Sequence, residues 1–573
     1  MDLERLIDVA AGRRPADLVL RGGKVVNVLS HEVYLADVAI AGDVIAGVGR
    51  YQAEEVVDVT GQYLCPGFID AHVHIESSML SVPEFAKVVV VHGTTAVVAD
   101  PHEIANVTGL EGIRYILSTS KYCPVQVYIM LSSCVPASHL ESAGAELDAV
   151  DLLPLFSDPW VLGLGEVMNY VGVVAGDEDV IDKLKIARPG VIDGHAPGLS
   201  GRELSAYAAA GIGSDHECTT AAQAHERLRL GMHVMIREGS QARNLDALLP
   251  LVTAENADRF MFVTDDKDVT DLLDEGQIDC MVRRAIAGGL PPTRAIRMAS
   301  YNAARYFGME KVGAIAPGYR ASVAVLEDLE TCRISRVYQG GRLVAADGAC
   351  VELPTPRKHP AVLRSTINIH WLEEEHFAVR SSEDGSAKVH VIELIEDQIN
   401  TLRTIEELSV ANGRVECDPS RDLLKLAVVE RHHASGNVGL GFVRGFSLTE
   451  GAMASSVAHD AHNLVVVGTN DADIYAAAVH LVRMRGGLCV VRGGQVLADV
   501  PLPIAGLMSD ASAEELSAGL DALHQAARDI GGTLRRPFMA LSFLTLSVIG
   551  ALKLTDQGLV DVERFQTIDL LAT

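Results

Sequence analysis

The pattern of apolar and polar positions changes twice along the chain. Residues 18–64 alternate apolar and polar side chains in short runs, which predicts strands joined by Gly-Gly or Gly-Asp turns. After Gly67 the apolar runs become nearly continuous in Val, Ile and Leu, and they alternate with helix-like segments of ten or more residues. This second pattern is typical of a parallel sheet. The alternating pattern returns at 316–352, where the GGRLV of 340–344 resembles the GGKVV of 22–26.

This order predicts an α/β fold with three parts. We expect a (β/α)8 TIM-like barrel at 66–312, inserted in a small composite β-domain formed by 1–65 and 313–355. The Pro-rich segment LPTPRKHP (353–360) marks a boundary, and 361–573 predicts a C-terminal mixed α/β domain. Within it, the apolar stretch 538–552 is interrupted by Ser and Thr and is short for a membrane span, so we expect a buried element.

Polar side chains able to bind a metal end five of the apolar runs after Gly67. Residues i and i+2 of a strand point to the same face, so the HxH of PGFIDAHVHIESS presents two imidazoles side by side. Each of these residues, taken alone, is equally consistent with a structural role at a strand end. The candidate metal ligands are His72, His74, Glu166, His195, His216 and Asp265.

The spacing of these residues suits the carboxyl-terminal face of a barrel, where active sites of this fold lie. His72 and Asp265 are 193 residues apart, which accommodates seven βα repeats of about 28 residues each. Four imidazoles and two carboxylates at one mouth suit a pair of divalent ions, and imidazole with carboxylate suits Zn, Mn or Fe.

Several longer motifs then resemble one family. HxH, an acidic residue, two further histidines and an aspartate in this order resemble the amidohydrolase superfamily. DPHEIANV (100–107), GAIAPGYRAS (313–322), GAMASSVAHDAHN (451–463), PLPIAGLMSD (501–510) and LKLTDQGLVDV (552–562) resemble the bacterial adenine deaminases within it. The resemblance covers nearly the whole chain. It implies hydrolysis of adenine to hypoxanthine and ammonia in purine salvage or catabolism.

The resemblance also implies a set of metal ligands, namely the six residues named above. They would hold two divalent ions per chain, Mn²⁺ or Fe²⁺ ahead of Zn²⁺, with Glu166 as the bridge. Many binuclear relatives bridge with a carbamylated Lys, so Glu166 argues against a dihydroorotase-like or hydantoinase-like enzyme. Two alternatives stay open: another binuclear amidohydrolase acting on a cyclic amide or aminoheterocycle, and a metal-binding protein without catalysis.

Other residues are candidates for catalysis or substrate binding. Asp265 can take a proton from the attacking water and deliver it to the leaving nitrogen, and Glu103 with His102 can serve the ring nitrogen N1. The structural alternatives are a helix cap for Glu103 and His102, a surface ion pair for Arg237 and Glu238, and a buried hydrogen-bond network for the HDAHN motif. The predicted substrate-binding residues are Glu76, Ser77, Arg237, Glu238, His459, Asp460 and His462.

Composition excludes several classes of protein. With 48 Lys+Arg against 76 Asp+Glu, the net charge of −28 disfavours nucleic acid and anionic membranes as partners. The HxE and PCxxC signature of cytidine-type zinc deaminases is absent, as is a GxxxxGK[ST] phosphate loop. Nine scattered cysteines and a start without an apolar leader predict a cytoplasmic protein. We also expect a homodimer.

Overall fold

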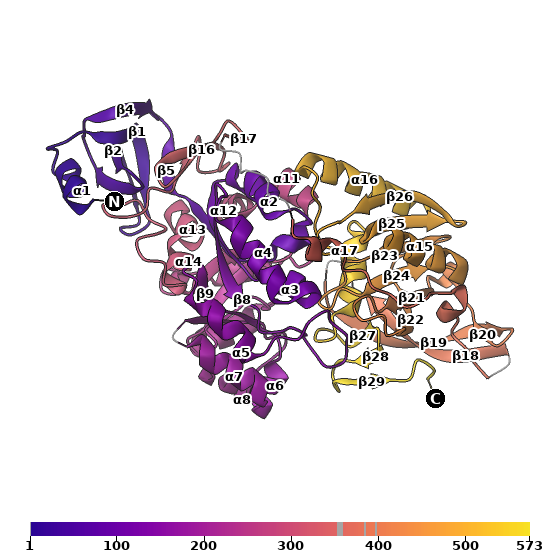
Figure 1. The fold of residues 1–573 in the computed structure, drawn as a ribbon. Helices are drawn as coiled ribbons and strands as arrows, with labels where there is room; N and C mark the ends of the chain where they lie inside the picture. The colour runs from indigo at the N-terminus through magenta and orange to yellow at the C-terminus, as the bar shows by residue number, and fades with distance from the viewer. Residues whose placement is uncertain (1, 189, 352–358, 383–384, 396–397, 573) are drawn as a thin grey trace.

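The computed structural model describes residues 2–188, 190–351, 359–382, 385–395 and 398–572. Its α/β region with parallel strands lies between a small β-sheet region near the N-terminus and a larger region formed by the C-terminal third of the chain (Figure 1). Most of the Pro-rich link at 353–360 lies outside the described residues.

The first sheet combines strands from both flanks of the α/β region. Its order is β17-β16-β15-β14-β5-β1-β2-β3, with β4 paired to β1, and β5 runs antiparallel to β14. The strands are β1 (Ala16–Asn27), β2 (Glu32–Ala41), β3 (Val44–Val48), β4 (Ala53–Asp58), β5 (Tyr63–Pro66), β14 (Val323–Leu326), β15 (Ile334–Gln339), β16 (Arg342–Ala346) and β17 (Ala349–Cys350).

One predicted turn in this sheet is wrong. Gly22 and Gly23 lie within β1, where the register against β2 shifts between Leu20 and Gly23. The chain therefore bulges at the pair and continues, because Gly22 at φ 76° absorbs an extra residue without reversing direction. The similar pair Gly340–Gly341 does form a hairpin turn, between β15 and β16.

Eight parallel strands follow, in two sheets. One has the order β10-β9-β8-β7-β6 and the other β11-β12-β13. Backbone hydrogen bonds join the sheets at both ends, from Gly213 N–H to the Ile192 carbonyl (2.9 Å) and from Asp265 N–H to the His72 carbonyl (3.0 Å). The strands are β6 (Phe68–Val73), β7 (Thr94–Ala99), β8 (Gln126–Leu131), β9 (Val161–Val167), β10 (Val191–Gly194), β11 (Ser214–Asp215), β12 (His233–Arg237) and β13 (Phe260–Val263).

These strands are buried on both faces, as their continuous apolar sequences predict. Helices lie between these strands and after β13 along the chain, and they cover the sheets (Figure 1). They are α2 (Val82–Val90), α3 (His102–Thr108), α4 (Leu110–Ser120), α5 (Ala149–Leu152), α6 (Tyr170–Ala175), α7 (Glu178–Ala187), α8 (Gly201–Ala209), α9 (Ala221–Arg229), α10 (Leu245–Leu248), α11 (Val269–Glu275), α12 (Ile278–Ala287), α13 (Pro292–Met298) and α14 (Tyr301–Tyr306).

The C-terminal region contains a mixed sheet of order β20-β19-β18-β22-β21-β24-β23-β25-β26 and a small sheet β27-β28-β29. Its strands are β18 (Gly385–Leu394), β19 (Thr401–Ala411), β20 (Arg414–Val415), β21 (Leu424–Val429), β22 (Val438–Arg444), β23 (Ala452–Ser455), β24 (Leu464–Gly468), β25 (Gly487–Arg492), β26 (Gln495–Pro501), β27 (Leu552–Thr555), β28 (Gly558–Asp561) and β29 (Gln566–Ile568). Its longer helices are α15 (Asp471–Met484) and α16 (Ala513–Asp529).

The apolar stretch 538–552 is buried, as expected. It forms α17 (Pro537–Ser542), a 3-10 turn (Phe543–Thr545) and the start of β27. No helix in the described part of the chain is long and apolar enough to cross a membrane.

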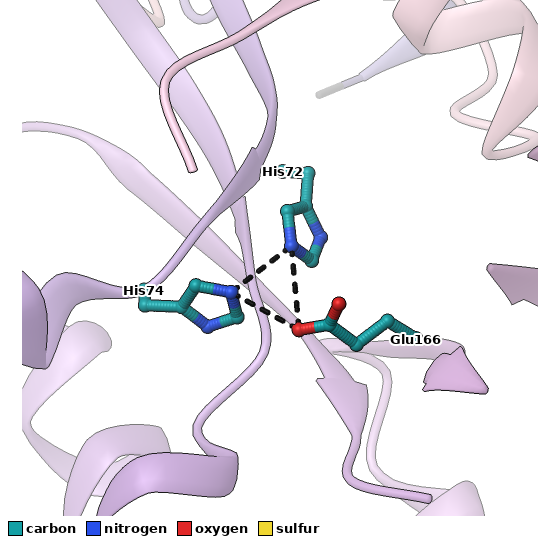
Figure 2. A group of neighbouring side chains, drawn as sticks. All are labelled: His72, His74 and Glu166. Atoms are coloured by element: carbon teal, nitrogen blue, oxygen red, sulfur yellow. Dashed lines mark hydrogen bonds and ion pairs between the residues drawn. The ribbon is translucent and has the colours of Figure 1, made fainter. Parts of the chain in front are cut away.

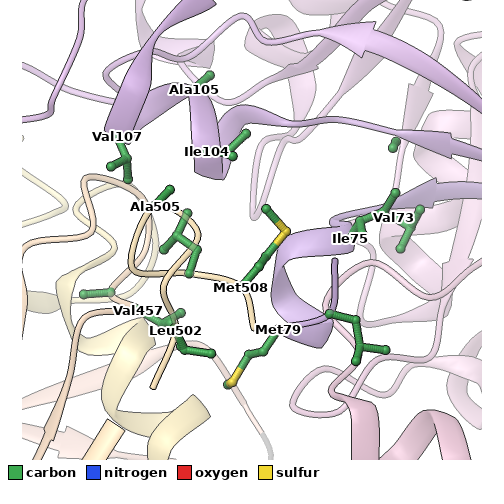
Figure 3. Packing of buried hydrophobic residues seen from close by; sticks show 14 of the residues in the cluster. Val73, Ile75, Met79, Ile104, Ala105, Val107, Val457, Leu502, Ala505 and Met508 are labelled. Atoms are coloured by element: carbon green, nitrogen blue, oxygen red, sulfur yellow. The ribbon is translucent and has the colours of Figure 1, made fainter. Parts of the chain in front are cut away.

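The C-terminal region packs directly on the loops that follow the first two parallel strands. A 3-10 turn (Ile75–Ser78) follows β6. In Figure 3, Met79 after this turn and Ile104 and Val107 of α3 lie in one apolar cluster with Leu502, Ala505 and Met508. The Ser509 N–H donates to the Met79 carbonyl at 2.7 Å. This contact brings the HDAHN motif close to the carboxyl ends of the parallel strands.

Candidate metal centre and active-site cavity

The structure brings the six predicted metal ligands together at the carboxyl ends of the parallel strands. His72 and Glu166 lie within β6 and β9. The others lie one or two residues after a strand end: His74 after β6, His195 after β10, His216 after β11 and Asp265 after β13. All six side chains are buried.

Four of them form a tight group of nitrogen and oxygen atoms. The Nε2 atoms of His72 and His74 are 3.1 Å apart, and His74 Nε2 is 3.1 Å from both Glu166 Oε1 and Asp265 Oδ1. Figure 2 shows the two imidazoles and the Glu166 carboxylate pointing toward one another. Ligands bound to one ion at about 2.1 Å stand roughly 3.0–3.4 Å apart, so these separations fit a shared cation.

The tautomer of His74 makes this fit specific. Its Nδ1 lies 3.0 Å from the Asp100 carbonyl, which can only accept a hydrogen bond, so Nδ1 carries the proton. In the neutral ring, the Nε2 lone pair therefore faces another imidazole nitrogen and two carboxylate oxygens. A divalent cation would satisfy all these acceptors at once, and a carbonyl behind a histidine is the usual support for a metal ligand.

A second group shares Glu166. Its Oε2 lies 2.7 Å from His195 Nδ1 and 3.1 Å from His216 Nε2, and the two rings are 3.2 Å apart at these nitrogens. Burial acts to raise the pKa of Glu166, but the charge of His195 and hydrogen bonds from the surrounding imidazoles hold it well below its usual range. Each oxygen of this carboxylate thus faces a different pair of histidines, so Glu166 could be shared by two cations.

Asp265 is held from two sides. Its backbone has φ 58°, an uncommon conformation for a residue with a side chain, and is fixed by backbone hydrogen bonds with His72 and His74. Arg237 donates to Oδ2 at 2.7 Å and forms a two-pronged ion pair with Glu217. Burial acts to raise the pKa of Asp265, but this guanidinium holds it well below its usual value. The carboxylate is therefore ionised and directed at the cluster.

A third cluster joins the two regions of the chain. Glu103, in the first turn of α3, contacts two histidines of the C-terminal region. One carboxylate oxygen lies 2.6 Å from His459 Nδ1, and the other forms a short hydrogen bond with His462 Nε2. His102 Nε2 lies 3.3 Å from Glu103, and 3.7 Å from Asp460. DPHE and HDAHN, more than 350 residues apart, thus form one buried network.

A small cavity lies over these groups. Polar atoms of the metal cluster, Arg237 and His459 line one part, and apolar side chains from the C-terminal region line another. These apolar residues are Ile399, Phe543, Leu546 and Ile549, with Met168 from the loop after β9.

Some predicted substrate-binding residues do not line this cavity. The Glu238 carboxylate accepts from the Leu245 N–H at 3.1 Å and pairs with Arg284, which is a structural role at the start of α10. Glu76 accepts from the Ile104 N–H at 3.2 Å, and burial raises its pKa to about 7. Ser77 hydrogen bonds Asp266, and His462 lies behind Glu103. His102, Arg237, His459 and Asp460 do line the cavity.

Sequence reasoning missed two kinds of residue. Glu217 and Asp266 directly follow predicted ligands and line the cavity, so their position beside strand ends was an available signal. The apolar wall gave no signal, because Phe543 and Leu546 have the pattern of any buried segment. Only the docking of the C-terminal region shows that they face the site.

Comparison with known proteins agrees with this geometry. The pattern of the Amidohydrolase family matches residues 63–344, and that of the Adenine deaminase C-terminal domain matches residues 398–566. The adenine deaminase of Desulfatibacillum aliphaticivorans is 48% identical over 570 residues, which cover 99% of both chains. The chain belongs to the adenine deaminase family.

Other adenine deaminases show the same full-length similarity. That of Dehalococcoides mccartyi is 48% identical over 569 residues, 99% of each chain. The sequence resemblance to this family is thereby confirmed, and with it an amidohydrolase-type fold. Among solved structures, the dihydropyrimidinase of Brevibacillus agri aligns with 58% of this chain and 96% of its own at 16% identity and a TM-score of 0.46, too low to inform the substrate.

Proposed function

We propose that the chain hydrolyses adenine to hypoxanthine and ammonia. The observation that carries this proposal is full-length similarity to adenine deaminases together with a small cavity that joins the six-ligand cluster to an apolar wall. A flat, uncharged heterocycle suits such a wall, and the exocyclic amine would then face the polar side. The product fits the same space, because oxygen replaces a nitrogen of similar size.

Two divalent ions would be held by the six buried ligands. We propose that His72, His74, Glu166 and Asp265 hold one ion, and that Glu166, His195 and His216 hold the other. Such ions supply Lewis acidity that lowers the pKa of water and makes it nucleophilic near neutral pH. The nitrogen and oxygen donor set suits Mn²⁺ or Fe²⁺, with Zn²⁺ as the alternative.

The protein's own groups then move protons and orient the ring. Asp265, kept ionised by Arg237, would accept a proton from the attacking water and pass it to the departing amine. Glu103 and His102 line the same cavity, and we place the ring nitrogen N1 on their side of it. Asp460 and Arg237 would contact the polar edge of the purine.

The proposal also covers the domain layout and the compartment of the protein. The backbone bonds between β6 and β13 and between β10 and β11 support one closed (β/α)8 barrel at 66–312. The composite sheet supports a β-domain of 1–65 and 313–355, and the sheet of β18–β26 a C-terminal domain of 361–573. The nine cysteines are scattered along the sequence without a CxxC pair, which supports a reducing compartment such as the cytoplasm. A homodimer stays a prediction.

The direct test is ammonia release from adenine with loss of the adenine absorbance band, using protein loaded with Mn²⁺. We expect turnover of adenine and none of dihydrouracil or hydantoin. Opening of a cyclic amide with adenine left intact would assign the chain to the alternative class of amidohydrolases.

Metal removal gives a second prediction. Dialysis against a chelator should abolish ammonia release, and Mn²⁺ or Fe²⁺ should restore it in proportion to ions bound, up to two per chain. Metal content and rate are measured on the same samples. Full activity at less than about half an ion per chain contradicts a metal-dependent reaction.

The apolar wall gives a third prediction. Leu546→Ala removes buried apolar surface that we place against the purine, at a cost of about 1 kcal/mol in binding. We expect KM for adenine to rise about fivefold with kcat within twofold. Leu402→Ala, on the half-exposed face of β19, is the matched control and should change neither value. An unchanged KM for Leu546→Ala would place the purine elsewhere.

A further inference from the structure

The Glu103 carboxylate has a charge state that its neighbours determine. His462 Nδ1 accepts a hydrogen bond from the Ala458 N–H at 3.1 Å, so Nδ1 carries no proton and Nε2 does. That Nε2–H donates to one oxygen of Glu103, and His459 Nδ1 lies 2.6 Å from the other. Burial acts to raise the pKa of Glu103, but the charges of the surrounding histidines hold it well below its usual range. Both oxygens therefore act as acceptors, and Glu103 is an ionised carboxylate rather than an acid.

The same tautomer argues against a third metal ion here. Glu103, His459 and His462 lie close enough to hold one. A metal on His462 Nε2 would require the proton to move to Nδ1, where it would face the Ala458 N–H. The trio therefore acts as a carboxylate that accepts from two imidazoles.

His459 is held rigidly in this arrangement. The His459 backbone N–H donates to the Ser542 carbonyl at 3.0 Å, and the Thr545 hydroxyl donates to the His459 carbonyl at 2.8 Å. Its ring stacks on Phe543 with 4.5 Å between centroids and 14° between planes. Two buried elements of the C-terminal region thus fix the ring against Glu103.

One nitrogen of His459 remains for a ligand. With Nδ1 on Glu103, Nε2 has no hydrogen-bond partner among the described residues, and the residue lines the cavity. His102 differs, because its two nitrogens lie 3.3 Å from Glu103 and 3.5 Å from Glu166. Among the histidines beside Glu103, only His459 combines a fixed carboxylate partner with a second nitrogen open to the cavity.

We propose that His459, oriented by Glu103, donates a proton from Nε2 to the purine ring nitrogen during adenine hydrolysis. This role rests on the proposed function. Burial lowers the pKa of His459, but the Glu103 charge outweighs it and raises the pKa to about 9, so the ring carries the proton at neutral pH. The C-terminal region thereby supplies a catalytic residue that the parallel strands and their loops lack.

The proton and electron balance follows directly. The water oxygen bonds to C6, the C6–N1 π pair moves to N1, and N1 takes the proton from His459. The C6–N6 bond then breaks, and ammonia leaves with the proton that Asp265 took from the water. The remaining hydroxyl proton returns to His459 as the C6 carbonyl forms. Hypoxanthine keeps its N1 proton.

The test compares His459→Ala and His459→Gln with His480→Ala, a partly exposed histidine of α15 paired to Asp499. We expect both His459 variants to lose about 10²–10³ in kcat, with KM within about fivefold and metal content unchanged. Imidazole added to His459→Ala should raise kcat at least tenfold. Substituted imidazoles should raise kcat to different extents, in an order set by their pKa. A purely structural role would show no such order.

Several outcomes overturn the role. They are activity of both His459 variants within threefold of the parent, loss of bound metal with activity, or equal activity with every imidazole. The kcat of Glu103→Gln should fall as far as that of His459→Gln. A Glu103→Gln variant with unchanged kcat also counts against the role of His459. If the unmodified enzyme releases no ammonia from adenine, the proposed function fails with this role. Full activity of the His459 variants removes this role alone.

Discussion

Glu166→Gln should abolish turnover and reduce bound metal together. The two carboxylate oxygens face different histidine pairs, with Oε1 3.1 Å from His74 and Oε2 2.7 Å from His195. An amide presents one oxygen and one NH₂ group, so it can bind one ion at most and carries no charge. Losing several kcal/mol of stabilisation of the developing charge lowers kcat by about 10³ or more.

The measurement is metal content per chain alongside ammonia release from adenine. Glu203→Gln, on the exposed face of α8, is the matched control and should keep both at the parent level. Two ions per chain in Glu166→Gln with activity near the parent would show that Glu166 does not bridge.

Arg227→Met should destabilise the fold strongly. Arg227 is fully buried, and its Nε donates to Asp215 at 2.8 Å while its Nη2 donates to the Ala196 carbonyl at 2.8 Å. Asp215 also accepts from the Glu217 N–H at 2.9 Å. Removing the arginine leaves a buried carboxylate without its counter-charge, which costs about 3–5 kcal/mol in free energy of unfolding.

This pair lies directly behind the metal cluster, since Ala196 follows His195 and Asp215 precedes His216. We therefore expect metal content to fall as well. Unfolding is measured on chelator-treated protein, because bound metal stabilises the folded state by itself. Arg229→Met changes an exposed arginine on the same helix and is the control. The double variant Arg227→Met, Asp215→Asn should recover part of the lost free energy of unfolding. A loss equal to that of Arg229→Met would show that the ion pair contributes little.

The strand-end residues show what local pattern can predict. Continuous apolar runs form parallel strands, and carboxyl ends of parallel strands meet at one edge, so His72, Glu166 and Asp265 could be placed together from spacing. Gly22 and Gly23 show the limit. The same dipeptide makes a turn at Gly340–Gly341 and a bulge within β1, because the neighbouring strand, not the glycine pair, decides whether the chain reverses.

The sequence by itself determined the order of elements, the family and the ligand types at the strand ends. Only the tertiary structure decided which face the C-terminal region covers. That docking brings His459 to Glu103 and Phe543 to the cavity, and it leaves Glu238 paired to Arg284 outside it. The physical reason is that periodicity reports burial along one element, whereas contacts across more than 350 residues depend on how separate surfaces fit.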